Sequence, residues 1–455
     1  MKAVILAGGL GTRLRPLTYT LPKPMVMLGS KPLIHLTAAK AANAGFDQII
    51  ITTNFMAKMV ADYFQRVDLG VPVLCVEEKT VMGTAGCVKN LENLLTGTFA
   101  VLPGDSITDL ELKVMIDFHK AQKSAATLAL IAVDSTSEFG IVQLDSNARI
   151  LRFQEKPKPE ESFSNLANTG YYVFEPSVLK FIPTGEPFDF SFGLFPRLLE
   201  AKLPMYGYLT DRFWVDVGRV EKYIAGSKWF LANSSSQIAA TAQIEESLPL
   251  GTRIAAGEGT IVKIGARVSD GTVLGKLVTV NTGAEVSSSI IYADTTIGAD
   301  CKISDAVIGD EVELQEGVVI ERSTIIGKGC HIGARAIIKA NSRVGPYFDV
   351  PPLATIEGVA SAFVEKGNML QLYIERNPEL TRLSRDEVAI LGLLAEFGEL
   401  PAKSLSNLGK IPYSQIHRLL FDLQHQGLIM GYGKTPRLFA LRHEYPERLK
   451  LEAGN

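Results

Sequence analysis

The chain has 455 residues, a formal net charge of −3 at pH 7 and 46% hydrophobic residues. This length exceeds what one typical hydrophobic core requires, so we expect two or three domains with ample room for a buried site. The near-neutral charge argues against general attraction to nucleic acid or anionic lipid as the main role. Small-molecule chemistry is therefore the better expectation.

The cysteines and the N-terminus indicate the compartment. The four cysteines are scattered and have no metal-ligand spacing, which favours buried thiols in a reducing environment. The first apolar strand begins just after Met1, which leaves no room for a signal peptide. No apolar stretch is long enough to cross a bilayer. We therefore expect a cytoplasmic protein with no membrane partner.

The first element is an apolar run, Val4 to Ala7, which ends in a glycine-rich loop at residues 8–11. Such a run is typical of a buried parallel strand, and glycines let backbone N–H groups approach an anion. The Arg13 guanidinium can bind phosphate through two N–H groups, and Lys23 adds a point charge. The pattern predicts a triphosphate cradle that also stabilises a leaving pyrophosphate. The glycines alone would equally fit a tight strand-to-helix connection.

The full string from Val4 to Met25 fits neither the dinucleotide fingerprint nor the P-loop. It resembles the signature of the sugar-phosphate nucleotidyltransferases, also called nucleotide-sugar pyrophosphorylases. The resemblance implies that the nucleotide contacts Leu6, Ala7, Gly8, Gly9, Gly11, Thr12 and Arg13.

Residues 1–233 alternate apolar runs with amphipathic stretches, which predicts a doubly wound α/β catalytic domain. The runs at 48–52, 71–76 and 99–102 are expected strands. Ligands of such sheets bind outside the carboxyl ends of the strands, so we expect the motifs that follow these strands to gather there.

The segment from Glu77 to Gly86 matches the base-contacting segment of the family and implies nucleotide contacts by Glu78, Gly83 and Thr84. Its Gly-Thr-Ala-Gly sequence resembles the mannose-1-phosphate guanylyltransferase branch. Met82 stands where that branch usually has Leu, a change that conserves volume and polarity. Glucose-1-phosphate enzymes share part of this sequence, so the segment does not decide which nucleotide base is bound.

Two aspartates follow apolar runs, Asp105 after Pro103-Gly104 and Asp216 within the segment 213–218. Carboxylate oxygens suit Mg²⁺ that is bridged to nucleotide phosphates. A lone Gly-Asp would more often close a turn. In the resembling family, aspartates at these two positions bind the metal, so the resemblance implies that Asp105 and Asp216 hold Mg²⁺.

Three further segments match the sugar-phosphate contacts of the family and contain Gly140, Glu155, Lys156 and Asn168. The resemblance implies that Glu155 binds sugar hydroxyls and that Lys156 neutralises the sugar phosphate. It also implies that Gly140 and Asn168 contact further hydroxyls. Two phosphates must meet against their mutual repulsion, so the acceptor needs a cation of its own. Without its flanking motifs, Glu-Lys-Pro would be interpreted as a solvated turn.

The implied reaction is in-line attack by a hexose 1-phosphate oxygen on the α-phosphorus of a nucleoside triphosphate, with pyrophosphate leaving. A phosphate monoester is mostly dianionic at neutral pH, since its second pKa is about 6, and no general base is required. Catalysis would rest on Arg13, Lys23, Lys156 and Mg²⁺. GTP with mannose 1-phosphate, giving GDP-mannose, is favoured over a glucose-1-phosphate uridylyl- or thymidylyltransferase.

Residues 236–347 consist of short β-branched runs with glycine at multiples of six residues, as at 307–312 and 325–330. This self-similarity predicts a left-handed parallel β-helix. In the resembling family such a β-helix usually serves homo-oligomerisation. Some relatives use it for acetyl transfer with a histidine base, and His331 is the single histidine of the repeats, where a solvent-facing role is favoured.

Residues 348–380 are expected to be a linker, and residues 381–445 resemble a winged helix-turn-helix. Helices are expected at 385–397, 400–408 and 412–426, followed by strands at 427–432 and 436–441. From residue 381 to the end, 10 Lys and Arg stand against 8 Asp and Glu, a weak electrostatic footprint for DNA. We therefore favour a protein or effector partner over DNA.

A different class of function is a catalytically weak regulatory chain that keeps the fold. Such copies usually lose the cationic loop or a metal carboxylate. Arg13, Lys23, Asp105, Lys156 and Asp216 are all present, and the prediction is an active enzyme.

Overall fold

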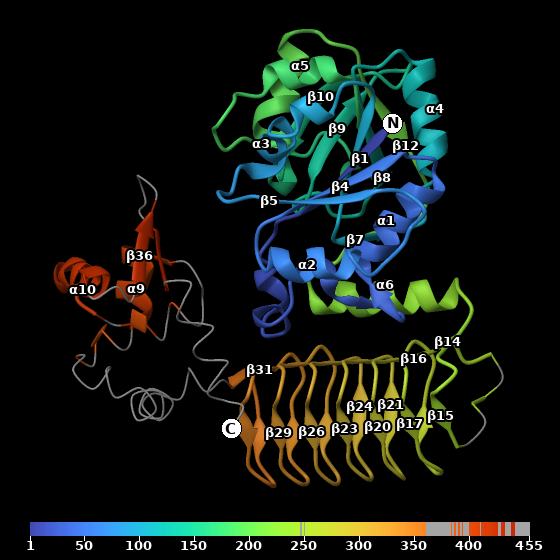
Figure 1. Cartoon of the computed structure of the whole chain (residues 1–455), viewed down its shortest axis with the longest axis vertical. Helices are drawn as coiled ribbons and strands as arrows, with labels where there is room; N and C mark the ends of the chain where they lie inside the picture. Colours follow the sequence, from blue (N-terminus) through green and yellow to red (C-terminus); the bar gives the residue numbers. More distant parts are fainter. Residues whose placement is uncertain are drawn as a thin grey trace.

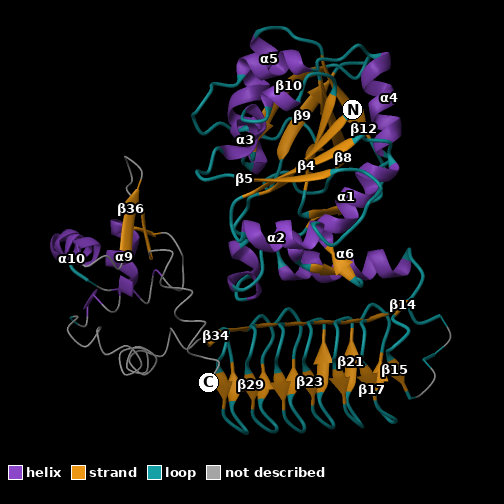
Figure 2. Cartoon of the chain, viewed as in Figure 1, coloured by secondary structure: helices purple, strands orange, loops and turns teal. Residues whose placement is uncertain are grey.

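The computed structural model describes residues 1–245, 248–249 and 251–360 together with parts of the C-terminal region. The described C-terminal residues are 384, 386–387, 390–391, 394, 400–409, 411–425, 429–432 and 438–441. Figures 1 and 2 show an N-terminal domain of helices around a twisted sheet, which lies alongside an elongated stack of short parallel strands. Within the described residues, no helix is long and apolar enough to cross a membrane.

The N-terminal domain is built on one nine-stranded sheet. Its strands are β1 (Lys2–Ala7), β4 (Gln48–Thr53), β5 (Val73–Glu77), β6 (Phe99–Pro103), β8 (Ala126–Ala132), β9 (Gly140–Leu144), β10 (Ile150–Glu155), β11 (Leu166–Phe174) and β12 (Met205–Leu209). The α-helices are α1 (Leu33–Asn43), α2 (Ala57–Phe64), α3 (Gly83–Lys89), α4 (Leu112–Ala121), α5 (Phe195–Glu200) and α6 (Val220–Ala232). Two small ribbons pair β2 (Met27–Leu28) with β3 (Lys31–Pro32) and β7 (Ser106–Thr108) with β13 (Trp214–Asp216).

The parallel half of this sheet determines where a ligand can bind. Strands β5, β4, β1 and β6 are neighbours in that order, and all are parallel. The chain thus builds outward from β1 through β4 to β5 and then returns to the other side of β1 with β6. Doubly wound sheets bind ligands outside the carboxyl ends of the strands at such a reversal. The loops after Ala7 and Pro103 therefore share the expected binding edge, and the predicted doubly wound fold is confirmed.

The other half of the sheet is mostly antiparallel, apart from the parallel pair of β8 and β12, and carries the predicted sugar-phosphate residues. Strand β11 pairs with β6, β8 and β9, and β10 pairs with β9. In that last pair Glu155 lies opposite Gly140. A bulge interrupts the pairing of β11 with β8 between Asn168 and Tyr172. Such bulges redirect side chains, and this one lies at a predicted sugar-contact residue.

A parallel β-helix with three sheets follows α6. The eight-stranded sheet contains β14 (Gln237–Ile238), β16 (Ala255–Ala256), β19 (Val273–Leu274), β22 (Ile290–Ile291), β25 (Val307–Ile308), β28 (Ile325–Ile326), β31 (Arg343–Val344) and β34 (Val359–Ala360). The seven-stranded sheet contains β15 (Gln243–Ile244), β17 (Ile261–Val262), β20 (Thr279–Val280), β23 (Thr296–Ile297), β26 (Glu313–Leu314), β29 (His331–Ile332) and β32 (Asp349–Val350). The six-stranded sheet contains β18 (Arg267–Val268), β21 (Glu285–Ser287), β24 (Lys302–Ser304), β27 (Val319–Ile320), β30 (Ile337–Ile338) and β33 (Thr355–Ile356).

The stacked parallel strands agree with the predicted β-helix. They continue to Ala360, past the boundary expected at 347 and into residues expected to be a linker. The inward positions Val350 and Ile356 keep packing against the apolar core of the stack, although the glycine punctuation has ended. The burial pattern therefore extends further along the chain than the glycine pattern.

The middle strands of the eight-stranded sheet, β16, β19, β22, β25 and β28, are apolar and buried on both faces, unlike the strands of the two partner sheets. Ile291 and Ile308 point into the β-helix core, whereas their neighbours Ile290 and Val307 pack against the N-terminal domain, and all four are 0% exposed. Strand β21 of the six-stranded sheet instead alternates an exposed Glu285 with buried Val286. Apolar pairs in which both residues are buried thus mark the sheet that the N-terminal domain covers.

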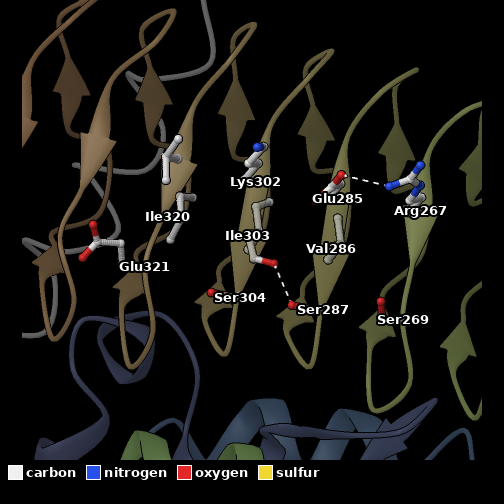
Figure 3. Close-up of a pocket in the computed structure, with 11 residues that line it drawn as sticks. Arg267, Ser269, Glu285, Val286, Ser287, Lys302, Ile303, Ser304, Ile320 and Glu321 are labelled. Atoms are coloured by element: carbon white, nitrogen blue, oxygen red, sulfur yellow. Dashed lines mark hydrogen bonds and ion pairs between the residues drawn. The ribbon is translucent and has the colours of Figure 1, made fainter.

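Figure 3 shows the opposite situation on the six-stranded sheet, whose outer face carries polar side chains. A surface pocket of about 230 Å³ is lined there by residues of the β-helix, including Arg267, Glu285 and Lys302. Arg267 and Glu285 form an ion pair at 3.3 Å, and Ser269, Ser287 and Ser304 follow one another along the stack. All lining residues belong to the β-helix, so this pocket is separate from the predicted catalytic residues.

The described C-terminal elements follow the predicted order, except that a short strand, Leu400–Pro401, stands where a helix was expected to begin. They are β35 (Leu400–Pro401), α9 (Ala402–Gly409), α10 (Tyr413–His425), β36 (Ile429–Tyr432) and β37 (Leu438–Leu441), and the three strands form one antiparallel sheet. The helix expected at 385–397 lies only partly within the described residues. The winged-helix assignment stays a prediction.

Helices α1 and α2 are joined by a partly buried polar cluster around His35. The Nδ1 and Nε2 atoms of His35 lie 3.0 Å from the Tyr63 hydroxyl and from Lys31 Nζ, respectively. A lysine ammonium only donates, so Nε2 accepts and Nδ1 carries the proton. Burial, and then the charge of Lys31, lower the pKa of His35 to about 4. The folded protein therefore holds this histidine neutral.

This cluster should make stability fall on acidification. Between pH 6.5 and pH 4, an unfolded His35 binds a proton that the folded one excludes, so the free energy of unfolding decreases as the pH falls. The contribution is at most about 1.4 kcal/mol per pH unit. Urea unfolding across this range should show a shallower pH dependence for His35→Gln than for wild type. The exposed His331→Gln is the control, and parallel curves for all three proteins would refute the assignment.

Candidate active site

Asp105 and Asp216 are brought together by the pairing of β7 with β13. Ser106 lies opposite Asp216 in this antiparallel ribbon, and the Val217 N–H donates to the Asp105 carbonyl at 3.1 Å. The register therefore places two residues that are far apart in the sequence beside each other. Asp105 and Asp216 keep 35% and 28% of their side-chain area exposed, so a ligand can reach both carboxylates.

Lys23 lies between the two carboxylates. Its Nζ is 2.6 Å from Asp105 Oδ2 and 3.2 Å from Asp216 Oδ1. The two oxygens share this neighbour and so cannot be further apart than 5.8 Å, the total of those distances. Burial by itself would lower the pKa of Lys23, but the two carboxylates outweigh it and raise the pKa above its ordinary value. The site thus holds a protonated lysine on a pair of acidic groups.

The glycine-rich loop after β1 packs directly against Lys23. Gly11 has a φ of 62°, and a Cβ at this position would lie 2.8 Å from the Lys23 Cβ. The Thr18 hydroxyl donates to the Gly11 carbonyl at 2.9 Å, which fixes the loop from the other side. Gly9, Thr12 and Arg13 are exposed. The predicted phosphate-binding loop therefore presents its backbone and its arginine to solvent next to the carboxylate pair.

Two contacts connect this loop with the carboxylates. The Gly104 N–H donates to the Leu6 carbonyl at 2.9 Å, so the loop before Asp105 lies against the end of β1. Arg13 Nη2 lies 3.6 Å from Asp216 Oδ2, and 57% of the arginine side chain is exposed. The loops of β1, β6 and β13 thus form one cluster.

Arg219 and Lys222 are candidate phosphate ligands that the sequence reasoning missed. Both pair with Glu138, at 2.9 Å and 2.5 Å. The hydrogen bond from Lys222 and the nearby cations Lys222, Arg219 and Arg13 lower the pKa of Glu138. Arg219 and Lys222 lie one helical turn apart at the start of α6, just after the Asp216 motif. Their i, i+3 spacing beside that motif was the available signal.

The predicted sugar-phosphate residues lie at the edge of the antiparallel half. A Cβ on Gly140 would lie 2.6 Å from Glu155 Oε2, so only glycine leaves room for that carboxylate. Lys156 has a φ of 43°, and its N–H donates to the Phe139 carbonyl at 3.0 Å. Its Nζ lies 3.9 Å from Glu155 Oε1, and 61% of its side chain is exposed. The ammonium is therefore accessible to an anion.

Asn168 forms hydrogen bonds within the protein. Its Nδ2 donates to the Tyr172 hydroxyl at 2.8 Å, and its Oδ1 accepts from the Gly170 N–H at 3.2 Å. These contacts span the bulge in β11. Asn168 thus supports the shape of the strand. Any contact with a sugar would use its second Nδ2 hydrogen or the second lone pair of its Oδ1.

The segment predicted to contact the base packs against a loop that the sequence did not indicate. The carbonyl oxygen of Phe188 would lie 2.7 Å from a Cβ on Gly83, which has a φ of 72°. Thr84 donates to Asp189 Oδ1 through its hydroxyl at 3.0 Å and its N–H at 3.1 Å. Burial raises the pKa of Glu78 above its ordinary value. Gly83 and Thr84 therefore have structural roles here that do not require a nucleotide.

The residues present fit a divalent cation that is shared with phosphate. Among the described residues, no group of three or more His, Cys, Asp or Glu could hold a metal by itself. Magnesium usually takes one or two carboxylates together with substrate phosphates and water. Asp105 and Asp216 supply the two carboxylates, and an ammonium already lies between them. This donor set suits a metal that arrives with a nucleotide.

Comparison with known families and proteins agrees with this geometry. The family model described as nucleotidyl transferase matches residues 2–233, and one described as GMPPB C-terminal domain matches residues 232–328. The chain belongs to the nucleotidyl transferase family. The resemblance drawn from the Val4–Met25 signature is thereby confirmed. Membership of this family makes the chain an enzyme, a sugar-1-phosphate nucleotidyltransferase.

Its relatives include enzymes for two different sugar phosphates. A probable mannose-1-phosphate guanylyltransferase 2 of Arabidopsis thaliana is 34% identical over 71% of this chain and 97% of its own length. A mannose-1-phosphate guanylyltransferase of Mycobacterium tuberculosis is 32% identical over 70% of this chain and 83% of its own length. A UTP–glucose-1-phosphate uridylyltransferase of Synechocystis is 32% identical over 68% of this chain and 87% of its own length.

A methyl group at Gly218 should separate Arg13 from Asp216. A Cβ at this position would lie 2.7 Å from Arg13 Nη2 and 2.8 Å from Asp216 Oδ2. Both atoms end flexible side chains, so we expect Gly218→Ala to fold normally but to lose about tenfold in pyrophosphate release, the equivalent of about 1.4 kcal/mol. Gly97→Ala, which enters open space, is the matched control. Equal rates for the two variants would show that the Arg13–Asp216 contact is dispensable.

Proposed function

We propose that this chain transfers a nucleotidyl group from a nucleoside triphosphate to a hexose 1-phosphate and releases pyrophosphate. The observation that carries the proposal is the meeting of Asp105, Asp216 and Lys23 beside the glycine-rich loop. Two carboxylates, an ammonium and exposed backbone N–H groups at one sheet edge suit a magnesium-bound triphosphate. Sugar-1-phosphate relatives that align over most of their own length support the acceptor class.

The chain's own residues would act by positioning and charge neutralisation. The backbone N–H groups of residues 8–12 and the Arg13 guanidinium bind the triphosphate, and Lys23 neutralises charge that develops on the leaving pyrophosphate. Lys156 holds the phosphate of the acceptor, so that its oxygen faces the α-phosphorus in line with the leaving group. Mg²⁺, held by Asp105 and Asp216, would supply further neutralisation of the triphosphate.

GTP and mannose 1-phosphate are the proposed substrates, and GDP-mannose is the product. Support comes from the mannose-1-phosphate guanylyltransferase relatives and from the Gly-Thr-Ala-Gly segment at residues 83–86. The uridylyltransferase relative keeps UTP and glucose 1-phosphate as the alternative. Pyrophosphate release across GTP, dTTP, UTP, CTP and ATP with each sugar phosphate distinguishes them. Absence of release with every pair would favour the regulatory alternative.

Removing either acidic charge should weaken metal binding and lower the activity. We expect Asp105→Asn and Asp216→Asn each to reduce kcat at least a hundredfold, because the remaining carboxylate holds the metal poorly. A titration of Mg²⁺ should also show a raised half-saturating concentration. Asp211→Asn, which changes an aspartate outside the site, is the control. An unchanged magnesium dependence in both variants would remove these residues as ligands.

Replacing Lys156 should weaken the binding of the acceptor sugar phosphate but not that of the donor triphosphate. We expect Lys156→Met to raise the KM for the sugar phosphate by about tenfold and to leave the KM for the triphosphate unchanged, because only the acceptor phosphate loses its cation. Lys158→Met removes a neighbouring exposed ammonium and serves as control. Equal effects of Lys156→Met on both KM values would place Lys156 outside the acceptor site.

The β-helix and the C-terminal module are expected to have roles of their own. We infer that the β-helix mediates homo-oligomerisation and that the C-terminal module binds a protein or effector, with DNA as the less favoured partner. Sedimentation velocity of the full chain tests the first, because a monomer at all concentrations contradicts it. Tight binding of duplex DNA that weakens steeply with salt would overturn the preference in the second.

A further inference from the structure

Three hydrogen bonds link the β-helix, helix α6 and the segment that carries Lys23. The Met27 N–H donates to the Tyr292 hydroxyl at 3.0 Å, and the Tyr223 hydroxyl donates to the Met27 carbonyl at 2.5 Å. The two hydroxyls lie 3.0 Å apart. Met27 is in β2, Tyr223 in α6, and Tyr292 directly follows β22 of the β-helix. The N–H and the carbonyl of Met27 are thus each held by a tyrosine hydroxyl.

The protons of this cluster can be assigned without ambiguity. The hydrogen of Tyr223 is used on the Met27 carbonyl, so the hydroxyl-to-hydroxyl bond must be donated by Tyr292. Each hydroxyl then donates once and accepts once, and the three bonds form a closed circuit. Tyr223 is 0% exposed and Tyr292 is 4% exposed. A buried circuit in which every member is satisfied rigidifies its surroundings, whereas the loss of one member leaves a buried polar group unpaired.

The circuit is connected to both sides of the active site. Met27 closely follows the 3₁₀-helix Lys23–Met25, where the Val26 N–H donates to the Lys23 carbonyl at 3.2 Å. Tyr223 lies one turn into α6, the helix that follows Asp216, and its N–H donates to the Arg219 carbonyl at 2.9 Å. The tyrosine pair therefore ties the backbone behind the lysine to the helix behind one of its carboxylates.

We propose that Tyr292 is a positioning residue for nucleotidyl transfer, and that the β-helix thereby holds Lys23 in register with Asp105 and Asp216. The proposal rests on the function proposed above. The proposed role of Tyr292 requires no contact with substrate. It acts through Met27 and the short helix of Lys23, whose ammonium must keep its place within hydrogen-bond distance of both carboxylates. The β-helix is then part of the catalytic apparatus as well as a scaffold.

The same interface contains a second contact that serves as an internal control. Lys228 Nζ of α6 lies 2.8 Å from Asp305 Oδ1 of the β-helix, and both side chains are about two-fifths exposed. This ion pair joins the same two parts of the chain without touching the Lys23 segment. A partly exposed pair of this kind contributes little to stability. Asp305→Asn therefore perturbs the interface while leaving the tyrosine circuit intact.

The test compares Tyr292→Phe and Tyr223→Phe with Asp305→Asn in the full chain. We expect each tyrosine variant to lower kcat about fivefold with an unchanged KM for the sugar phosphate, and Asp305→Asn to behave as wild type. The same tyrosine change is then made in a Lys23→Met background. If Tyr292 acts through Lys23, its effect on kcat disappears there, whereas an equal loss in both backgrounds overturns the proposal.

Hydrogen exchange of the amides gives a readout that does not need activity. We expect faster exchange of the peptide that covers residues 23–28 in Tyr292→Phe, because the Met27 N–H has lost its acceptor. Asp305→Asn should leave this peptide unchanged. Unchanged exchange in Tyr292→Phe would refute the positioning role even if no substrate pair supported turnover. An inactive wild type with the expected exchange pattern would instead count against the proposed function alone.

Discussion

Two acidic groups at one sheet edge would repel each other, and the structure resolves this with a single buried ammonium. Lys23 neutralises Asp105 and Asp216, and their charges in turn keep Lys23 protonated despite its burial. The arrangement holds carboxylates close enough to share one cation before any ligand arrives. Low local dielectric strengthens such a cluster and also makes its geometry demanding. The surrounding fold can be understood as the means of keeping these three side chains in place.

Each of the three comes from a different part of the sheet. Asp105 follows β6, Asp216 ends β13, and Lys23 belongs to the connection between β1 and α1. The return of the chain from β5 to β6 places the β1 and β6 loops together, and the β7–β13 ribbon adds Asp216. The site therefore depends on one topological reversal and one strand register. A shift of that register by one residue would turn Asp216 to the other face.

The β-helix is joined to this arrangement by an extensive interface. The middle strands of its eight-stranded sheet present apolar residues on both faces, and the outer set packs against α6 and the segment around β2. This burial explains why pairs such as Ile290-Ile291 and Val307-Ile308 are buried on both faces, whereas Ile337-Ile338 on the six-stranded sheet keeps one side chain partly exposed. The outer face of the six-stranded sheet instead carries charged side chains such as Arg267, Glu285 and Lys302 (Figure 3). The tyrosine pair lies within this apolar interface, where water cannot easily replace its hydrogen bonds.

By itself, the sequence determined the local chemistry: the glycine loop, the two aspartates after apolar runs, the β-helix repeats and the order of the C-terminal elements. These follow from patterns within a few residues, where side-chain period and turn chemistry decide. Only the tertiary structure decided that Lys23 lies between Asp105 and Asp216, that Thr84 pairs with Asp189, and that Tyr292 holds Met27. Those contacts join residues distant in sequence, so they depend on strand register and on which faces pack together. No local pattern encodes either.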